Sequence, residues 1–270
     1  MKKTIILSSM LLALGVSFSA SAAHHEASEH QASEHQDIKQ KASIYEAAVA
    51  NAARSDKDKA VDDLRKPASV LEFFEIKPGM KVFDVFAGGG YYSEILSYLV
   101  GPDGAVTLYN NDPWDAFVDK AVTPRLADNR LPNVTRLVAT PESLLEQDAA
   151  QYDSAIFILG MHDLYYADPD TGWVAIDRDA FLRGIHHILK EGGVLGIIDA
   201  NALPGADNEV VGKSVHRVDP QAVIDDVVKA GFTLVEKSDL LSNPEDDRVS
   251  SVFTPENRYN TDRSVLKFRK

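Results

Sequence analysis

The stretch Val82-Phe-Asp-Val-Phe-Ala-Gly-Gly-Gly-Tyr-Tyr-Ser-Glu-Ile-Leu96 decides the fold of this chain. Its apolar run breaks at three consecutive glycines, Gly88 to Gly90, and then resumes with helical spacing. This order predicts a strand, a tight turn and a helix. Glycine permits positive φ and lets a ligand approach the main chain, and the amide groups that open a helix face outward. We therefore expect a nucleotide-like ligand at the turn.

The acid of this stretch, Asp84, lies before the turn, and its place discriminates between two cofactors. A dinucleotide-binding turn reads Gly-x-Gly-x-x-Gly, with an acid about 20 residues further on for the ribose. Here Ser93 replaces the last glycine, and the next predicted strand ends in Asn110 and Asn111. A carboxylate entering the turn repels pyrophosphate but suits a cationic ligand. The pattern disfavours a nicotinamide-dependent oxidoreductase.

The segment Asp84-Val-Phe86-Ala-Gly88-Gly-Gly90 resembles motif I of the class I S-adenosylmethionine-dependent methyltransferases, whose usual form is acid-x-Gly-x-Gly-x-Gly. Phe86 stands where the first glycine is usual. The resemblance implies that S-adenosylmethionine is the cofactor, that the glycine turn lies under its methionine part, and that Asp84 helps to hold its amino end. It extends over about residues 65 to 270.

Composition limits the classes of protein and partner. With 270 residues, 44% of them hydrophobic, the chain can bury one substantial core in a domain of roughly 230 residues. The net charge of −13, without a basic stripe, argues against nucleic acid, so we expect a small-molecule substrate. The chain has no cysteine, which excludes disulfides, thiolate metal sites and a thiol nucleophile. The oligomeric state is left open.

The N-terminal residues have the features of a targeting segment. Two lysines, an apolar run from about Ile5 to Phe18 and the small residues Ala20-Ser-Ala22 predict a signal peptide over residues 1–22. The mature chain is then periplasmic or secreted, without stable membrane insertion; the alternative is an uncleaved anchor, although the run is short for a span. Residues 23–37, rich in His and Glu, predict a disordered spacer, with weak binding of zinc, copper or nickel as the alternative.

The remainder, residues 38–270, predicts one α/β domain with an N-terminal helical cover. We expect a helix capped by Ser55 and a break near Pro67, and a later helix opened by Asp219-Pro220. Further helices are expected near 90–100, 113–128, 142–149 and 176–190. Strands are expected at 81–86, 104–110, 133–139, 153–160, 193–199, 232–237 and 264–268. The alternation predicts a Rossmann-like, doubly wound, seven-stranded sheet with helices on both faces, mostly parallel with an antiparallel last strand.

Ligands of such sheets bind at the carboxyl ends of the strands, so the residues that follow each strand are the candidates. After the first strand, the resemblance implies cofactor contacts from Asp84, Ala87, Gly88, Gly90 and Tyr91. After the second, where the family usually places an acid for the ribose hydroxyls, Asn110 and Asn111 can accept and donate hydrogen bonds; an ordinary helix cap is the alternative. After the third, Glu142 is expected beside the adenine.

The fourth strand is followed by His162, Asp163, Tyr165 and Tyr166. At neutral pH His162 can act as a general base, oriented by Asp163, and we assign these two residues as catalytic. The two tyrosines are expected to bind the substrate. A purely structural role for His162 is the alternative.

The segment His216-Arg217-Val-Asp219-Pro follows the fifth strand and resembles an element of a group of exported predicted bacterial methyltransferases. We assign His216 and Arg217 to substrate binding, with an anion-holding role for Arg217; a capped turn is the alternative. No metal ligand is assigned in the folded part of the chain.

Together these features predict methyl transfer from S-adenosylmethionine to an unidentified small-molecule acceptor. Such a reaction requires mainly in-line alignment and exclusion of water. Because S-adenosylmethionine is made in the cytoplasm whereas the N-terminus predicts export, the alternative is an exported, non-catalytic protein that binds a small ligand with a methyltransferase fold.

Overall fold

The computed structural model describes residues 44–270, apart from the side chains of residues 119 and 120. The predicted signal peptide, residues 1–22, and the predicted spacer, residues 23–37, lie outside the described residues. Within the described part, no helix is both long and apolar enough to cross a membrane.

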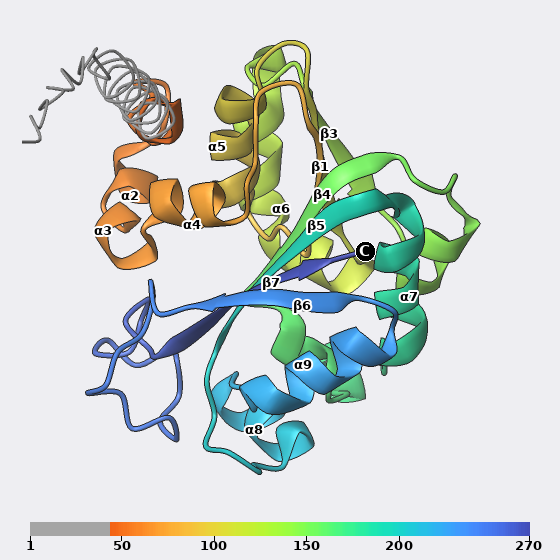
Figure 1. The fold of residues 1–270 in the computed structure, drawn as a ribbon. Helices are drawn as coiled ribbons and strands as arrows, with labels where there is room; N and C mark the ends of the chain where they lie inside the picture. Colours follow the sequence, from red (N-terminus) through yellow and green to blue (C-terminus); the bar gives the residue numbers. More distant parts are fainter. Residues whose placement is uncertain (1–43) are drawn as a thin grey trace, which may run out of the picture. The chain divides into compact units, whose positions relative to one another are not determined.

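A seven-stranded sheet with the order β3-β2-β1-β4-β5-β7-β6 forms the centre of the domain (Figure 1). The strands are β1 (Lys81–Val85), β2 (Ala105–Asn110), β3 (Val134–Val138), β4 (Tyr152–Ile158), β5 (Leu189–Ala200), β6 (Thr233–Ser238) and β7 (Arg263–Arg269). The first five strands pair in parallel, and β7 runs antiparallel to both β5 and β6. The predicted seven-stranded sheet with an antiparallel last strand is confirmed.

Helices connect the strands and precede the sheet. A helical segment at residues 44–49 is followed by α2 (Asp56–Lys59), α3 (Asp62–Arg65), α4 (Pro67–Phe73), α5 (Tyr91–Val100), α6 (Asp112–Leu126), α7 (Arg178–Ile188), α8 (Asn208–Val215) and α9 (Pro220–Lys229), with 3₁₀ turns η1 (Ala127–Asn129), η2 (Pro141–Glu146), η3 (Met161–Leu164) and η4 (Pro169–Thr171). The predicted caps are present, since Ser55 accepts a hydrogen bond from the first turn of α2 and Asp219 from that of α9. Pro67 opens α4 directly after Lys66, whose φ is +45°.

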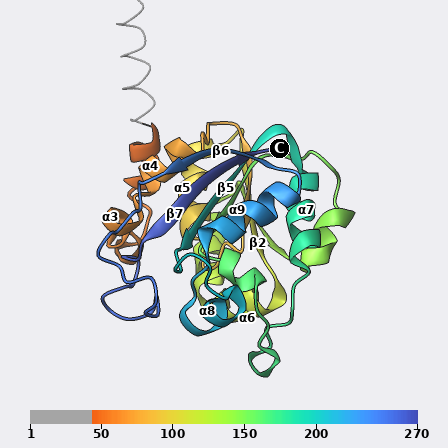
Figure 2. The same cartoon turned by 60° about the horizontal axis from the view of Figure 1, so that its bottom comes forward.

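Alternating residues of β1 divide the core into two layers. Val82 faces a cluster built with α4 and α5, whereas Phe83 and Val85 face a cluster built with α7 and α9. Figures 1 and 2 show these helix pairs on opposite faces of the sheet. The layers leave the carboxyl ends of the parallel strands at one edge.

Two segments differ from the sequence prediction. The helix expected at 142–149 is the shorter 3₁₀ turn η2, which ends at Glu146. The helix α8 was not predicted; it begins after Asp207, whose side chain accepts from two amides of its first turn. At eight residues, α8 is too short for a distinct period in the sequence.

Candidate functional site

The glycine turn joins β1 to α5 and is tied to the end of β2. Gly88 and Gly90 have φ of +58° and +82°, in the left-handed region that favours glycine. The Gly88 N–H donates to Oδ1 of Asn110 at 3.0 Å, and Nδ2 of Asn110 donates to the Gly88 carbonyl at 3.2 Å. The Ala87 N–H donates to the Tyr109 carbonyl at 3.0 Å. The fully buried Asn110 side chain thus holds the turn in place.

Phe86, at the position of the usual first glycine, has a φ of +46° despite its side chain. Its buried ring stacks on Tyr109 and Phe181 at centroid distances of 5.7 and 5.3 Å. Trp173 meets the same ring edge-on at 6.1 Å. Aromatic packing beneath the turn therefore offsets a backbone conformation that costs about 1–3 kcal/mol for a non-glycine residue.

Asp84 lies under the first turn of α5. Its Oδ2 accepts from the Ser93 hydroxyl at 2.6 Å, and the residue is 2% exposed. Burial raises the pKa of Asp84 to about 7, although the hydrogen bond from Ser93 and the charge of Arg65 act in the opposite direction. At neutral pH its carboxyl group is therefore close to the midpoint of its titration.

Tyr91, the first residue of α5, is covered by the N-terminal helices. Its hydroxyl donates to Asp62 at 2.5 Å, and the guanidinium of Arg65 lies 3.9 Å from the ring centroid. Burial and the contact with Asp62 raise the pKa of Tyr91. Asp62 and Arg65 of α3 thus pack on the start of α5, and a helical cover over the ligand crevice stays a prediction.

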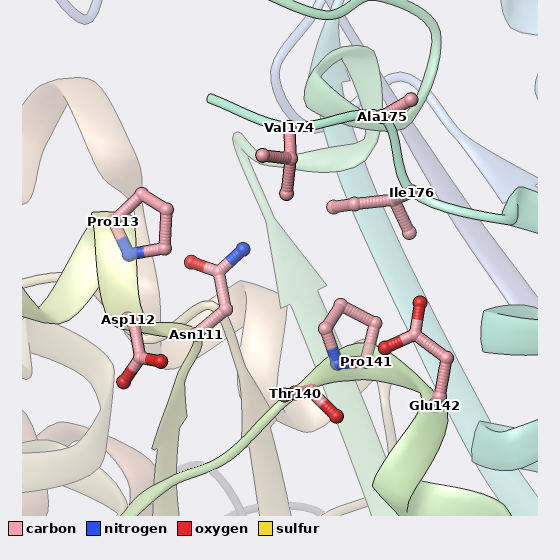
Figure 3. Close-up of a pocket in the computed structure, with 9 residues that line it drawn as sticks. All are labelled: Asn111, Asp112, Pro113, Thr140, Pro141, Glu142, Val174, Ala175 and Ile176. Atoms are coloured by element: carbon pink, nitrogen blue, oxygen red, sulfur yellow. The ribbon is translucent and has the colours of Figure 1, made fainter. Parts of the chain in front are cut away.

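A pocket lies at the carboxyl ends of β2 and β3 (Figure 3). Its volume is about 120 Å³, and its lining includes Asn111, Asp112, Thr140, Glu142 and Val174. The Asn111 side chain also caps α6 by accepting from the Trp114 N–H at 3.1 Å, so the predicted helix cap is present at the pocket wall. Two of the predicted cofactor residues, Asn111 and Glu142, meet here.

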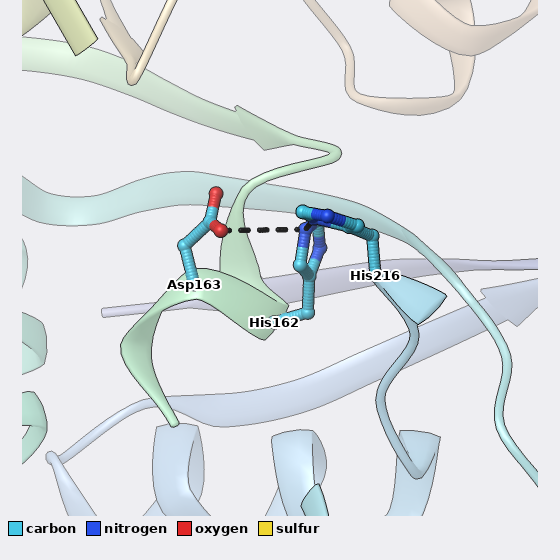
Figure 4. Close-up of side chains that lie close together, drawn as sticks. All are labelled: His162, Asp163 and His216. Carbon is cyan, nitrogen blue, oxygen red and sulfur yellow. Dashed lines mark hydrogen bonds and ion pairs between the residues drawn. The ribbon is translucent and has the colours of Figure 1, made fainter. Parts of the chain in front are cut away.

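A second group of polar residues lies at the carboxyl ends of β4 and β5. Nδ1 of His162 lies 3.0 Å from both carboxylate oxygens of Asp199, and Nε2 lies 3.2 Å from Nδ1 of His216. Oδ1 of Asp163 lies 3.4 Å from the same Nε2 and accepts from the Tyr166 hydroxyl at 2.9 Å. Figure 4 shows that His162 and Asp163 come from the η3 turn and His216 from the end of α8.

The charges in this group favour a cation at His162. Burial lowers the pKa of its imidazole, but the charges of Asp163 and Asp199 and the hydrogen bond to Asp199 outweigh burial and raise the pKa to about 9. Burial and the charge of His162 lower the pKa of His216 to about 4. His162 therefore carries a proton at neutral pH, which disfavours a free general base. The predicted base role stays a prediction.

Comparison with known proteins agrees with this geometry. Residues 31–123 match the family model of protein-L-isoaspartate(D-aspartate) O-methyltransferase. The ubiquinone/menaquinone biosynthesis C-methyltransferase UbiE of Shewanella sp. (strain W3-18-1) is 29% identical over 129 residues, which are 48% of this chain and 46% of that protein. The alignment thus spans a little under half the length of that relative.

Solved structures share the fold over most of the chain. A SAM-dependent methyltransferase from Aquifex aeolicus superposes with a TM-score of 0.55 at 21% identity, covering 78% of this chain and 93% of the other. This chain has the class I methyltransferase fold, and part of it is similar in sequence to methyltransferases. The [4+2]-cyclase SpnF is similar to the same extent, with a TM-score of 0.55 at 15% identity and coverage of 82% and 85%. A class I methyltransferase fold is therefore compatible with more than one reaction.

Two residues predicted to bind substrate, Tyr165 and Arg217, direct their polar groups to partners outside the His162 group. Tyr165 donates its hydroxyl to Asp226 of α9 at 2.7 Å. Arg217 is fully buried and forms a two-point ion pair with Asp246, at 2.7 and 2.9 Å. In the described structure Arg217 anchors the polar segment that precedes β7. Its guanidinium is ion-paired with Asp246 and so does not face a bound anion.

Asp199 and Trp173 were not predicted. Asp199 ends the apolar run of the fifth strand of the methyltransferase sheet, and a polar residue at that place was an available signal. Trp173 follows a polar turn that has no periodic pattern. It donates its indole N–H to the Asp163 carbonyl at 3.1 Å and so joins the segment before α7 to the His162 group.

Proposed function

We propose that this protein transfers a methyl group from S-adenosylmethionine to a small-molecule acceptor. The observation that carries the proposal is that the glycine turn and the pocket are linked through consecutive residues, Asn110 and Asn111. Asn110 binds Gly88, and Asn111 lines the pocket. A nucleoside-like ligand could then lie with its methionine part over the turn and its adenine beside Glu142.

The chain's own residues suggest how such a ligand would be held. Because the Asn110 amide is engaged by Gly88, the acids at the pocket, Asp112 and Glu142, are the candidates to accept the ribose hydroxyls. The turn backbone would carry the methionine part, with Asp84 beneath it. When bound, the cofactor supplies an activated methyl group on a sulfonium, so the protein has chiefly to align the acceptor and exclude water.

The acceptor is proposed to lie toward the ends of β4 and β5. His162, Asp163 and Tyr166 gather there with His216, whereas Tyr165 and Arg217 are engaged elsewhere. The group carries donors and acceptors suited to a polar small molecule. The net charge of −13 supports a neutral or cationic acceptor over a polyanion.

Calorimetric titration with S-adenosylhomocysteine tests the proposal. Glu142→Gln removes a charged acceptor at the pocket and should weaken binding at least tenfold, which is about 1.4 kcal/mol. Glu146→Gln, on the same η2 turn but outside the pocket lining, is the matched control and should bind like the unaltered chain. No heat of binding at millimolar ligand would end the cofactor assignment.

A second candidate function is ligand binding without methyl transfer, in an exported protein. The ring of Phe86 and its aromatic neighbours fill the space beneath the turn, and the pocket of about 120 Å³ is small beside the ~300 Å³ at which small-molecule sites begin. Export is proposed from the pattern of residues 1–22. Binding of S-adenosylhomocysteine with no methylation of any member of a broad acceptor panel would favour this candidate.

A further inference from the structure

We propose that His162, Asp163 and His216 form a binding site for a divalent transition-metal ion of the zinc class. The ligating atoms of these three side chains lie within 4.8 Å of one another, and they are the only such group of three among the residues that the structure describes. No part of the sequence predicts this site, because His162 and His216 are 54 residues apart.

The spacing of the ligand atoms fits a tetrahedral ion. Nitrogen and oxygen ligands at about 2.0–2.2 Å from zinc lie roughly 3.3–3.6 Å from one another. Nε2 of His162 lies 3.2 Å from Nδ1 of His216 and 3.4 Å from Oδ1 of Asp163. These two separations need shifts of only a few tenths of an ångström, the third ligand pair lies within 4.8 Å, and Figure 4 shows the three side chains converging.

The surroundings orient the ligands in the way that metal sites require. A histidine ligand almost always donates its other ring N–H to a carboxylate or carbonyl, which fixes the tautomer. Asp199 accepts from Nδ1 of His162 and also from its backbone N–H at 2.9 Å, so Nε2 is the nitrogen left to bind an ion, which displaces the proton that the imidazolium carries without metal. The Tyr166 hydroxyl holds the Asp163 carboxylate.

The group holds two buried carboxylates, and the one cationic partner that both have is the imidazolium of His162. Asp163 and Asp199 are both buried, at 4% exposure each, and no lysine or arginine in the described part of the chain pairs with either. Among the described residues, Oδ2 of Asp163 is buried without a hydrogen bond of ordinary geometry; burial raises the pKa of this carboxyl, and the side chain of Trp114 acts on it as a donor in the opposite direction. Buried carboxylates are stable when they are paired or coordinate a metal. A divalent ion would neutralise two of them at once.

The backbone conformation of His216 directs its ring toward His162 and Asp163. Its φ of +56° lies in the left-handed region, which is uncommon for residues other than glycine and turns the ring inward at the end of α8. The His216 ring is half-buried, and the 56% exposed Phe253 packs against it at a centroid distance of 4.6 Å. An ion would reach the ligands from solvent past this exposed ring.

Two nitrogens and one carboxylate oxygen suit zinc and its neighbours better than magnesium or calcium, which prefer oxygen. Three protein ligands leave at least one position for water or for an oxygen of a bound acceptor, as in catalytic rather than structural zinc sites. The site does not depend on the proposed methyl transfer. Its test measures bound metal, so failure of one does not imply failure of the other.

The test uses the full chain with the four histidines before residue 36 changed to glutamine, so that only folded-domain ligands are measured. We expect one equivalent of Zn²⁺ per chain to remain after gel filtration in metal-free buffer, as measured by mass spectrometry. Co²⁺ in its place should give the visible absorption of a four-coordinate ion. Substoichiometric Zn²⁺ together with no cobalt spectrum would overturn the proposal in favour of a simple hydrogen bond between two imidazoles.

Substitutions assign the ligands. His216→Gln and Asp163→Asn should each lower Zn²⁺ affinity at least tenfold, and Asp199→Asn about 10- to 100-fold. His187→Gln on α7, where the imidazole bonds the Gln147 carbonyl, is the matched control and should leave affinity unchanged. Affinities are compared among variants that keep the native circular-dichroism melt. Unchanged affinity in a folded His216 or Asp163 variant refutes the site, and if neither folds, the stoichiometry and cobalt spectrum of the parent chain decide.

Discussion

Replacing the buried acid of the glycine turn by its amide, Asp84→Asn, should make the protein more stable, and more so as the pH rises. Burial raises the pKa of Asp84 from 3.8 to about 7 in the folded protein. Between these two values the folded state holds a proton that the unfolded state has released. The free energy of unfolding of the unaltered chain therefore falls as pH rises through this window, and the loss is complete above about pH 7.

The magnitude follows from the difference in pKa. At about 1.36 kcal/mol per pK unit, the change from 3.8 to about 7 corresponds to roughly 4 kcal/mol. Little solvent screening reduces this value, because Asp84 is only 2% exposed. The amide keeps an oxygen that accepts from the Ser93 hydroxyl, so the substitution removes the charge with little change in packing.

Urea denaturation followed by tryptophan fluorescence at pH 4 to 9 measures the effect. The difference in unfolding free energy between Asp84→Asn and the unaltered chain should be near zero at pH 4 and reach several kcal/mol above pH 7. Ser93→Ala is the informative companion, because it removes a hydrogen bond that favours the charged form and should steepen the loss of stability with pH. A pH-independent difference, or an amide variant that is less stable at pH 8, would refute the reasoning.

Three further predictions concern the turn and its surroundings. Gly90→Ala should lower the free energy of unfolding, measured in urea, by about 2–4 kcal/mol, and Gly79→Ala by only about 1–2 kcal/mol. Both glycines have φ near +80°, so both variants are strained. Only at Gly90 would an added Cβ also meet atoms at 2.9 and 3.0 Å. Asn110→Asp, which cannot donate to the Gly88 carbonyl, should cost about 1–3 kcal/mol and weaken S-adenosylhomocysteine binding in calorimetry. Arg217→Gln should cost about 3–5 kcal/mol in the same urea assay, because it leaves a buried carboxylate unpaired.

Each of these has a result that contradicts it. Equal losses in Gly90→Ala and Gly79→Ala would mean that the neighbours of Gly90 move freely. An Asn110→Asp chain with undiminished stability would show that the amide contributes nothing to the turn. For Arg217 the matched control is Lys229→Gln, since Lys229 pairs with Asp179 but is 66% exposed on its side chain. A loss as large as that of Arg217→Gln in this exposed pair, expected at about 0–1 kcal/mol, would contradict the argument from burial.

Local patterns in the sequence determined the architecture. The apolar run into Gly88, the periods of two and 3.6 that followed, and the caps at Ser55 and Asp219 predict elements that the structure confirms to within a few residues. The antiparallel last strand followed from the lack of a helix before it. Such features depend on residues close together in the chain, so they can be read without knowing the fold.

Only the tertiary structure decided what the site residues touch. Asn110, expected at the ribose, instead pairs with Gly88, and Arg217, expected to hold an anion, pairs with Asp246 in the interior. The contact between His162 and His216 joins residues 54 positions apart, each placed by the end of a different element. The sequence alone indicated several of the side chains that reach the carboxyl edge of the sheet, His162 and Asn111 among them, but not Asp199. Packing decided which of them meet, because ligand geometry depends on shifts of an ångström between segments that no local pattern connects.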